Sequence, residues 1–298
     1  MSTDRPTNEP TRARAATEET SGARRDRQRP PAPEPLPLPV VDNHCHLDIA
    51  DGDWLETREA IELAGSVNVT RIVQIGCDLP GARWAVAAAA EHPELIAGVA
   101  LHPNEAPRVE DLDAAMAEIE ALAGAHDLVR AVGETGLDHF RTGEDGRAVQ
   151  EESFRRHIDL AKRLDKTLVI HDRDAHDEVL RVLDEEGAPD RWVMHCFSGD
   201  VDLARACLER GAHLSFAGTV TFKNAAGLRN ALAVTPIDRL LVETDAPYLT
   251  PTPFRGRPNA SYLVPHTVRA MAEVRGDDLE TLCEAINLNT ERAFGGPW

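Results

Sequence analysis

The sequence predicts a (β/α)8 TIM barrel, and three observations lead to this prediction. Eight short apolar runs follow one another from residue 40 onward, amphipathic stretches separate them, and ionisable residues stand at the carboxyl ends of five runs. Apolar strands that alternate with helices are typical of a parallel sheet covered on both faces. Eight such units indicate a closed barrel, and a doubly wound open sheet is the alternative architecture.

Each apolar run is expected to form one strand of the sheet, and the strands are 40–44, 71–75, 96–101, 128–133, 167–170, 192–194, 213–216 and 240–242. The stretches between them show the spacing of amphipathic helices. The expected helices are 54–66, 81–91, 112–123, 148–164, 175–186, 201–210 and 225–233, with final helices after Pro265. The barrel domain is therefore expected to span residues 39–298.

Residues 1–38 differ in composition from the rest of the chain. Eight of the twenty prolines lie at or before Pro39, and almost no aliphatic residue precedes Leu36. Because such a segment buries little apolar surface, it is expected to be a disordered tail whose removal leaves the barrel stable. Any function of the tail would be recruitment of a partner, such as an unknown protein.

The amino-acid composition limits which cellular compartment and which kinds of binding partner we expect. Five cysteines, without Cys-x-x-Cys spacing or a secretory apolar segment, favour a protein of the reducing cytoplasm. No apolar stretch approaches the roughly 20 residues that span a bilayer. The net charge is −19, and the tail, with seven Arg against six acidic residues, contributes almost nothing to it. An acidic body disfavours coating of nucleic acid through a basic face, but it permits a local pocket that takes phosphates.

Six potential metal ligands stand at the ends of the predicted strands. His44 and His46 close the first run and, as residues i and i+2 of a strand, leave it on the same face. The other four follow the fourth, fifth, sixth and eighth runs: Glu134, His171, His195 and Asp245. Strand ends converge at one mouth of a barrel, so these side chains are expected to meet in one pocket.

The predicted pocket has the ligand types of a two-metal site. Imidazole nitrogens and carboxylate oxygens together suit Zn²⁺, Mn²⁺ or Mg²⁺ without selecting one of them. Glu134 has two oxygens and can bridge two divalent cations about 3.5 to 4 Å apart. Two such cations would leave the site positively charged and attractive to a phosphate.

Five stretches in this order resemble the TatD-type metal-dependent deoxyribonucleases, a branch of the amidohydrolase superfamily: DNHCHLD, GETGLD, IHDRDA, HCFSG and ETDAPYLTP. The resemblance covers residues 40–295. It implies that His44, His46 and Asp245 hold one metal ion, that His171 and His195 hold a second, and that Glu134 bridges them.

The resemblance also implies an activity, namely hydrolysis of DNA phosphodiesters by a metal-activated water with Asp245 as general base and Glu134 as the second catalytic residue. Since few basic residues lie near the expected mouth, strand ends are the expected substrate, as for an exonuclease. Arg173, His102 and Lys223 are the candidate contacts to substrate, although capping of a turn by His102 and solvation of Lys223 are equally compatible with the sequence.

The sequence departs from the family pattern after the eighth strand. The family usually reads Arg-Gly-x-x-Asn-Glu-Pro there, whereas this chain has Ala-Ser after Asn259. Because that loop shapes the pocket mouth, other hydrolytic substrates remain open, namely amides, lactones or aminoacyl esters. A non-catalytic adaptor that holds metal is the alternative from a different class.

Overall fold

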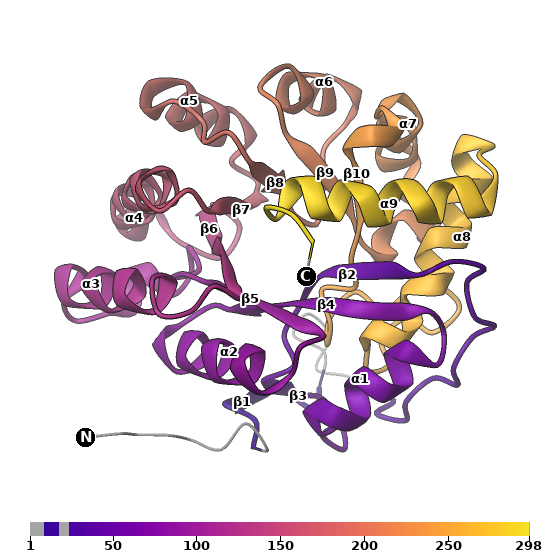
Figure 1. The fold of residues 1–298 in the computed structure, drawn as a ribbon. Helices are drawn as coiled ribbons and strands as arrows, with labels where there is room; N and C mark the ends of the chain where they lie inside the picture. Colours follow the sequence, from indigo (N-terminus) through magenta and orange to yellow (C-terminus); the bar gives the residue numbers. More distant parts are fainter. Residues whose placement is uncertain (1–8, 18–23, 298) are drawn as a thin grey trace.

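The computed structural model describes residues 9–17 and 24–297. Eight parallel strands form a nearly closed barrel, with the helices arranged around it (Figure 1). The strands follow one another around the barrel in chain order, from β2 to β4 and on to β10. The prediction of a (β/α)8 barrel is therefore confirmed, and the open sheet is excluded.

The barrel strands are β2 (Val40–Cys45), β4 (Val69–Gly76), β5 (Leu95–Val99), β6 (Val129–Asp138), β7 (Thr167–Arg173), β8 (Trp192–Met194), β9 (His213–Phe216) and β10 (Leu240–Val242). The last three have the predicted bounds. In contrast, β6 and β7 continue past the predicted ends and remain paired, with a register shift between Gly133 and Thr135. Glu134 and His171 consequently lie within strands and not in loops.

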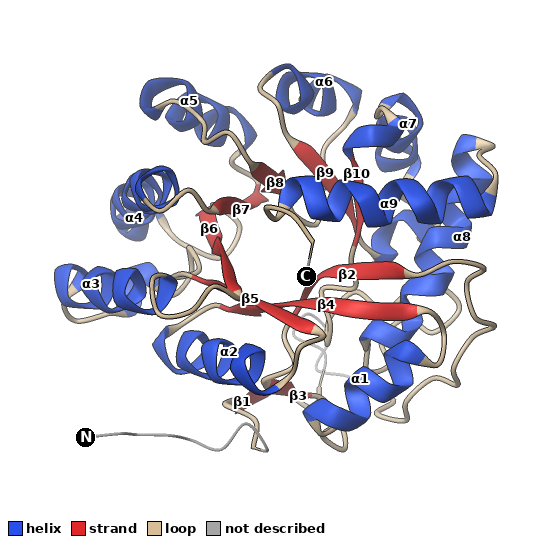
Figure 2. Cartoon of the chain, viewed as in Figure 1, coloured by secondary structure: helices blue, strands red, loops and turns tan. Residues whose placement is uncertain are grey.

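Nine helices surround the strands of the described chain (Figure 2). They are α1 (Thr57–Gly65), α2 (Leu79–Glu91), α3 (Leu112–Ala123), α4 (Glu144–Arg163), α5 (His176–Glu186), α6 (Val201–Glu209), α7 (Ala226–Val234), α8 (Val264–Arg275) and α9 (Leu279–Ala293). Short 3-10 helices join them: η1 (Ala106–Arg108), η2 (Gly218–Thr221), η3 (Ile237–Arg239) and η4 (Ser261–Leu263). Aspartates begin several of the helices; Asp78, for example, accepts a hydrogen bond from the backbone N–H of Gly81 at 2.7 Å.

The strands are buried on both faces, which explains their near-continuous apolar sequences. One set of side chains fills the barrel interior, including Val41, Ile75, Val169 and Leu241. A larger set packs between the strands and the surrounding helices. The interior is therefore a packed core, and the polar chemistry is left to the strand ends.

Strands β2 and β10 complete the ring largely through their carboxyl ends. The backbone N–H of Asp245 donates to the carbonyl of His44 at 2.9 Å, and that of His46 donates to the carbonyl of Ala246 at 2.8 Å. The side chain of Asn43 donates to the carbonyl of Val242 at 2.9 Å. Closure of the barrel thus brings Asp245 beside the two histidines of β2.

The N-terminal region differs from the expected disordered tail. Residues 12–13 form a short strand, β1 (Arg12–Ala13), which pairs in parallel with β3 (Ile49–Ala50) in the loop after β2. Farther along, Leu36 is buried in the core. Disorder is thus not observed for residues 9–17 and 24–38, whereas residues 1–8 and 18–23 lie outside the described part of the chain. Backbone pairing and charged side chains make the attachment, so a count of apolar residues could not predict it.

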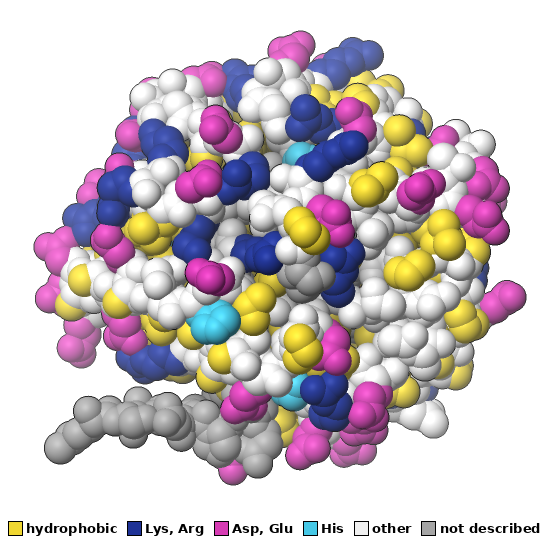
Figure 3. Space-filling model, in the orientation of Figure 1, with side chains coloured by type: hydrophobic (Ala, Val, Ile, Leu, Met, Phe, Trp, Pro, Cys, Tyr) yellow, Lys and Arg dark blue, Asp and Glu magenta, His cyan; other side chains and the backbone are white. Residues whose placement is uncertain are grey.

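No helix in the described ranges 9–17 and 24–297 is long and apolar enough to cross a membrane. The face of the molecule in Figure 3 carries Lys and Arg side chains interspersed with Asp and Glu side chains.

Candidate metal centre

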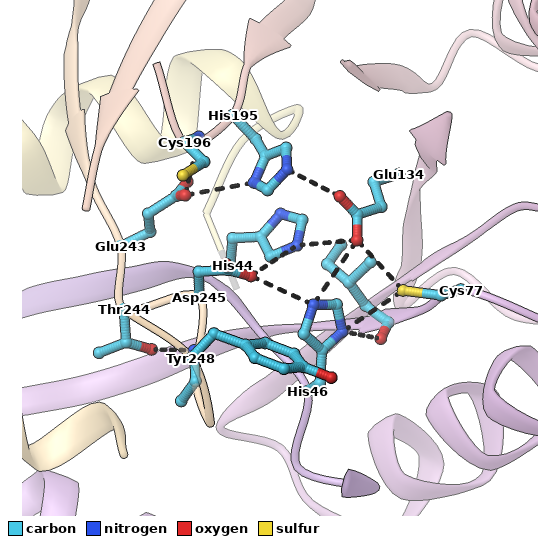
Figure 4. Close-up of polar contacts among 12 residues, drawn as sticks. His44, His46, Cys77, Glu134, His195, Cys196, Glu243, Thr244, Asp245 and Tyr248 are labelled. Carbon is cyan, nitrogen blue, oxygen red and sulfur yellow. Dashed lines mark hydrogen bonds and ion pairs between the residues drawn. The ribbon is translucent and has the colours of Figure 1, made fainter. Parts of the chain in front are cut away.

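The six predicted ligands meet at the carboxyl ends of the barrel strands. Five of them, together with neighbouring side chains, are labelled in Figure 4. They come from β2, the residue following β2, β6, β7, the segment after β8 and the segment after β10: His44, His46, Glu134, His171, His195 and Asp245. Residues far apart in the sequence are thus assembled into one cluster.

Glu134 lies between two sets of imidazoles. Its Oε1 atom lies 3.8 Å from His44 Nε2 and 3.6 Å from His46 Nε2. Its Oε2 atom lies 3.2 Å from His171 Nδ1 and 2.7 Å from His195 Nε2. Each carboxylate oxygen therefore faces its own pair of histidines.

Asp245 completes the set on the Oε1 side of Glu134. Its Oδ1 atom lies 3.3 Å from His46 Nε2 and 3.9 Å from His44 Nε2. The side chains of Asp245 and His171 are 15% and 17% exposed, whereas that of Glu134 is 5% exposed. The cluster therefore opens to solvent beside Asp245 and His171.

His44 provides the test of whether a metal ion fits here. Both of its ring nitrogens are buried and have no hydrogen-bond partner among the described residues. Its ring stacks on that of His195, with centroids 3.9 Å apart. Burial lowers the pKa of His44, which favours the neutral imidazole with a free lone pair. Since buried polar atoms are normally satisfied, these nitrogens fit coordination to a cation.

The charge of Glu134 is compatible with this assignment. Burial raises the pKa of Glu134, but the neighbouring His195 and His102 rings and hydrogen bonds from His171 and His195 lower it well below the ordinary value. The group is therefore an ionised carboxylate.

Three groups of His and Glu side chains within the described residues could hold a metal ion, each with ligand atoms within 4.8 Å of one another. They are His44 with His46 and Glu134, His44 with His195 and Glu243, and His102 with Glu134 and His171. His102 thus lies in the cluster, where its Nε2 atom is 3.9 Å from Glu134 Oε1. Its Nδ1 atom accepts a hydrogen bond from the backbone N–H of Asn104 at 3.0 Å, so His102 also caps the turn.

Sequence reasoning missed Glu243. This fully buried carboxylate lies with Oε1 3.2 Å from His195 Nδ1, and the same oxygen accepts a hydrogen bond from the backbone N–H of Cys196 at 2.8 Å. A carboxylate on the second ring nitrogen orients a metal-binding histidine and increases its basicity. Glu243 stands two residues before Asp245, and residues i and i+2 of an extended strand share a face. This spacing could have identified Glu243 as a residue of the site.

Asp138 and Cys77 were also missed. Asp138 Oδ2 lies 3.4 Å from His171 Nε2 and accepts a hydrogen bond from the side chain of Asn104 at 2.9 Å. The thiol of Cys77, directly after β4, lies 3.2 Å from Glu134 Oε1. Asp138 is the last residue of β6 and Cys77 is the first residue after β4, so their positions at strand ends were the signal that could have found them.

The other two predicted substrate contacts lie on β7 and in the loop after β9. Arg173 ends β7, and its guanidinium stacks over the ring of Phe140 at 3.9 Å from the centroid. Lys223 is exposed in the loop after β9, next to Phe222. Phe222 and Cys196 line a cavity of about 410 Å³. Contact of these residues with a substrate stays a prediction.

Residues 41–295 match the family described as TatD related DNase. A Mycobacterium tuberculosis protein described as an uncharacterized metal-dependent hydrolase TatD is 47% identical over 264 residues, which cover 87% of this chain and 99% of that protein. A Bacillus subtilis protein described as an uncharacterized metal-dependent hydrolase YabD is 38% identical over 256 residues, which cover 86% of this chain and 98% of that protein.

The crystal structure of YjjV, a TatD homologue from Escherichia coli, superposes with a TM-score of 0.81 at 27% identity, covering 87% of this chain and 98% of that one. The matched region includes all six predicted ligands. The chain therefore belongs to the TatD-related DNase family and is a metal-dependent hydrolase.

Proposed function

We propose that this hydrolase cleaves phosphodiester bonds of DNA from strand ends, using two divalent cations. The observation that carries the proposal is the position of Glu134 between two pairs of imidazoles, one pair at each carboxylate oxygen. Two-metal sites hold their ions about 3.5 to 4 Å apart, a spacing that one carboxylate can bridge.

In this proposal, His44, His46 and Asp245 would hold one ion, His171 and His195 would hold the other, and Glu134 would be a ligand shared between them. Such ions, when bound, polarise the phosphoryl oxygens and lower the pKa of a coordinated water. The mixture of nitrogen and oxygen donors suits Zn²⁺, Mn²⁺ or Mg²⁺.

In the proposal, Asp245 accepts the proton of the attacking water. It is the carboxylate of the cluster on the solvent side, next to His46. Burial raises the pKa of Asp245, but the hydrogen bond and charge of His46, together with the charge of His195, lower it overall. Asp245 is consequently ionised and has a free lone pair for a proton.

The family description supports DNA as the substrate, and the charge of the chain supports strand ends. With a net charge of −19, the protein offers little attraction to a long duplex backbone. Arg173, at the end of β7, can fork onto a phosphate next to the centre, while His102 and Lys223 supply further polar contacts.

The experiment uses full-length protein stripped of metal and reconstituted with Mg²⁺, Mn²⁺ or Zn²⁺. The substrates are end-labelled linear DNA, circular single-stranded DNA and chromogenic carboxylic esters, and metal content is measured by elemental analysis. We expect two ions per chain and release of terminal nucleotides from linear DNA before circles are nicked. If only the esters were hydrolysed, the protein would be a hydrolase of another class. If the protein bound metal but hydrolysed none of the substrates, a non-catalytic adaptor would be favoured.

The first prediction concerns Glu134→Gln, which keeps the size of the side chain but removes the charge shared by the two ions. We expect less than about one-tenth of the wild-type kcat/KM with every metal, a loss above about 1.4 kcal/mol. Glu110→Gln, at an exposed site, is the matched control and should retain full activity. If the Glu134→Gln variant bound two ions and kept the wild-type rate, Glu134 would not be required for catalysis.

A further inference from the structure

The described parts of the N-terminal region, residues 9–17 and 24–38, form what is here named the N-terminal strap. The family match begins at residue 41, so the strap lies before the region that this chain shares with its family. Its first part pairs through β1 with β3, in the loop that follows His46. The strap therefore reaches the end of the barrel where the metal ligands lie.

Specific polar contacts hold the strap in place. Arg25, which is 7% exposed, donates to both carboxylate oxygens of buried Asp51, at 2.8 and 2.6 Å. The hydroxyl of Thr11 donates to Asp48 Oδ2 at 2.6 Å, and Asp48 stands two residues after His46. A bidentate buried ion pair and backbone pairing order the segment around Arg12.

Arg12 lies close to the residues that line the metal centre. Its Nη1 atom is 3.6 Å from Asp78 Oδ2. Asp78 adjoins Cys77, whose thiol contacts Glu134 Oε1. Burial lowers the pKa of Arg12, but charges at Cys77, Asp78 and Tyr248 raise it above the ordinary value, so all of these groups lie within electrostatic reach of the guanidinium. A strap residue thus places a positive charge at the rim of the centre.

The guanidinium of Arg12 retains capacity to bind an anion. The side chain is 37% exposed, and its ion pair with Asp78 is longer than a hydrogen bond. Its Nε atom is buried and has no hydrogen-bond partner among the residues the structure describes. The exposed part of the guanidinium is therefore the part that a phosphate can reach, and the unsatisfied Nε indicates that the protein does not use all of its donors.

Arg14 supports the rim next to Arg12. Its guanidinium lies 4.8 Å from the ring centroid of Tyr248, and its Nη1 atom donates to the carbonyl of Pro247 at 2.9 Å. Tyr248 lies edge-on to His46, with ring centroids 6.3 Å apart (Figure 4). The strap therefore contacts Tyr248 through Arg14, while Arg12 pairs with Asp78, the residue next to Cys77.

We propose that the N-terminal strap is part of the substrate-binding surface and that Arg12 binds a backbone phosphate adjacent to the one held at the metal centre. A guanidinium suits this role because its planar donors fork onto phosphate oxygens. One such charge matters in a chain whose net charge is −19. The inference rests on the proposed phosphodiester chemistry and extends it to a residue outside the family region.

The test compares Arg12→Ala with wild type and with Arg24→Ala, a variant that removes the same charge from an exposed position of the strap. Binding of a labelled single-stranded oligonucleotide with phosphorothioate linkages is measured by anisotropy from 50 to 400 mM NaCl. Hydrolysis is measured on the ordinary oligonucleotide and on bis(p-nitrophenyl) phosphate, whose single phosphodiester cannot also reach Arg12.

For Arg12→Ala we expect the Kd of the oligonucleotide to rise about tenfold. The slope of log affinity against log salt should lose about 0.7 in magnitude, as for one phosphate contact to a single strand. The KM for the oligonucleotide should rise with little change in kcat, and bis(p-nitrophenyl) phosphate should be hydrolysed at the wild-type rate. Arg24→Ala should match wild type throughout.

Equal effects of Arg12→Ala and Arg24→Ala on binding would overturn the inference. So would an equal loss on both substrates, since Arg12 would then act by supporting Cys77 and Asp78. The proposed function fails separately, if wild type cleaves no DNA. Binding of the oligonucleotide that depends on Arg12 would, even then, support the strap as an anion-binding surface.

Discussion

At the scale of single residues, the orientation of each imidazole is set by a second polar partner. His46 Nδ1 lies 2.9 Å from the carbonyl of Ile75, which leaves Nε2 facing Asp245. His195 has Glu243 on Nδ1, which leaves Nε2 facing Glu134. Such partners restrict the tautomer and the ring orientation, so the centre is organised before an ion binds.

A second prediction tests Glu243 as a positioning residue. Glu243→Gln keeps the volume of the buried side chain but removes the negative charge that makes His195 a better donor. We expect the affinity for the more weakly bound ion to fall about tenfold. Metal titration followed by calorimetry measures this, and Glu209→Gln at an exposed site of α6 is the control. If the metal affinity of Glu243→Gln equalled that of wild type, Glu243 would contribute to packing only and not to the positioning of His195.

At the scale of elements, the strap shows how a segment poor in apolar residues is held on a barrel. The hydroxyl of buried Tyr262 donates to the carbonyl of Pro30 at 2.6 Å, and Trp84 Nε1 donates to the carbonyl of Glu9 at 3.1 Å. Leu36 then inserts into the core, where its backbone N–H donates to the carbonyl of Val67 at 3.1 Å. The strap is therefore attached at several places along its length, by hydrogen bonds to its backbone, by side-chain contacts such as that of Arg25 with Asp51, and by one apolar anchor.

A third prediction follows for truncated chains. Removing residues 1–38 deletes buried Leu36, worth about 1.5 to 3 kcal/mol, and leaves Asp51 without Arg25. We expect the melting temperature to fall by about 5 °C or more, measured by circular dichroism. Removing residues 1–8 alone keeps every contact described above and is the control. Equal melting temperatures of both truncations and the full chain would show that the strap does not stabilise the barrel.

At the scale of the whole molecule, stability depends on the buried core and on buried groups that stay neutral. Surface ion pairs are numerous, such as that of Arg155 with Glu185 between α4 and α5, but exposed pairs contribute little. His157 of α4 is different, because it is fully buried and its Nε2 atom accepts a hydrogen bond from the backbone N–H of Leu101 at 3.2 Å. Protonation of His157 would remove that acceptor.

A fourth prediction concerns pH. Burial lowers the pKa of His157 to about 4, from an ordinary value of 6.5. As the pH falls below 6.5, His157 binds a proton in the unfolded chain but stays neutral in the folded protein. The contribution of His157 to stability is therefore full above pH 6.5 and is lost as the pH falls towards 4, by about 3 kcal/mol.

The measurement is urea unfolding at pH 7, 5.5 and 4.5 in the presence of a chelator. His157→Gln retains an acceptor for Leu101 without a titrating ring, so its free energy of unfolding should fall less steeply with pH than that of wild type. His126→Gln, at an exposed site, should follow wild type. Parallel curves for wild type and His157→Gln would rule out this histidine as a source of acid sensitivity.

The sequence by itself determined the barrel and the composition of its mouth. Apolar runs such as 192–194 and 240–242 are typical of buried strands, and helices between them indicate a parallel sheet. Since parallel strands place their carboxyl ends at one mouth, His44 and Asp245 could be expected together although 201 positions separate them. Local pattern and topology suffice for these inferences.

Only the tertiary structure decided which side chains touch. Three contacts depend on positions defined to within a few ångströms, which a sequence pattern does not give. Glu134 presents one oxygen to each pair of histidines, Glu243 supports His195, and Cys77 contacts Glu134. The strap is the clearest case, because Arg25 binds Asp51 through geometry that no periodicity encodes. Composition reports how much apolar surface a segment can bury, whereas directional hydrogen bonds and ion pairs between distant residues exist only once the barrel has brought them together.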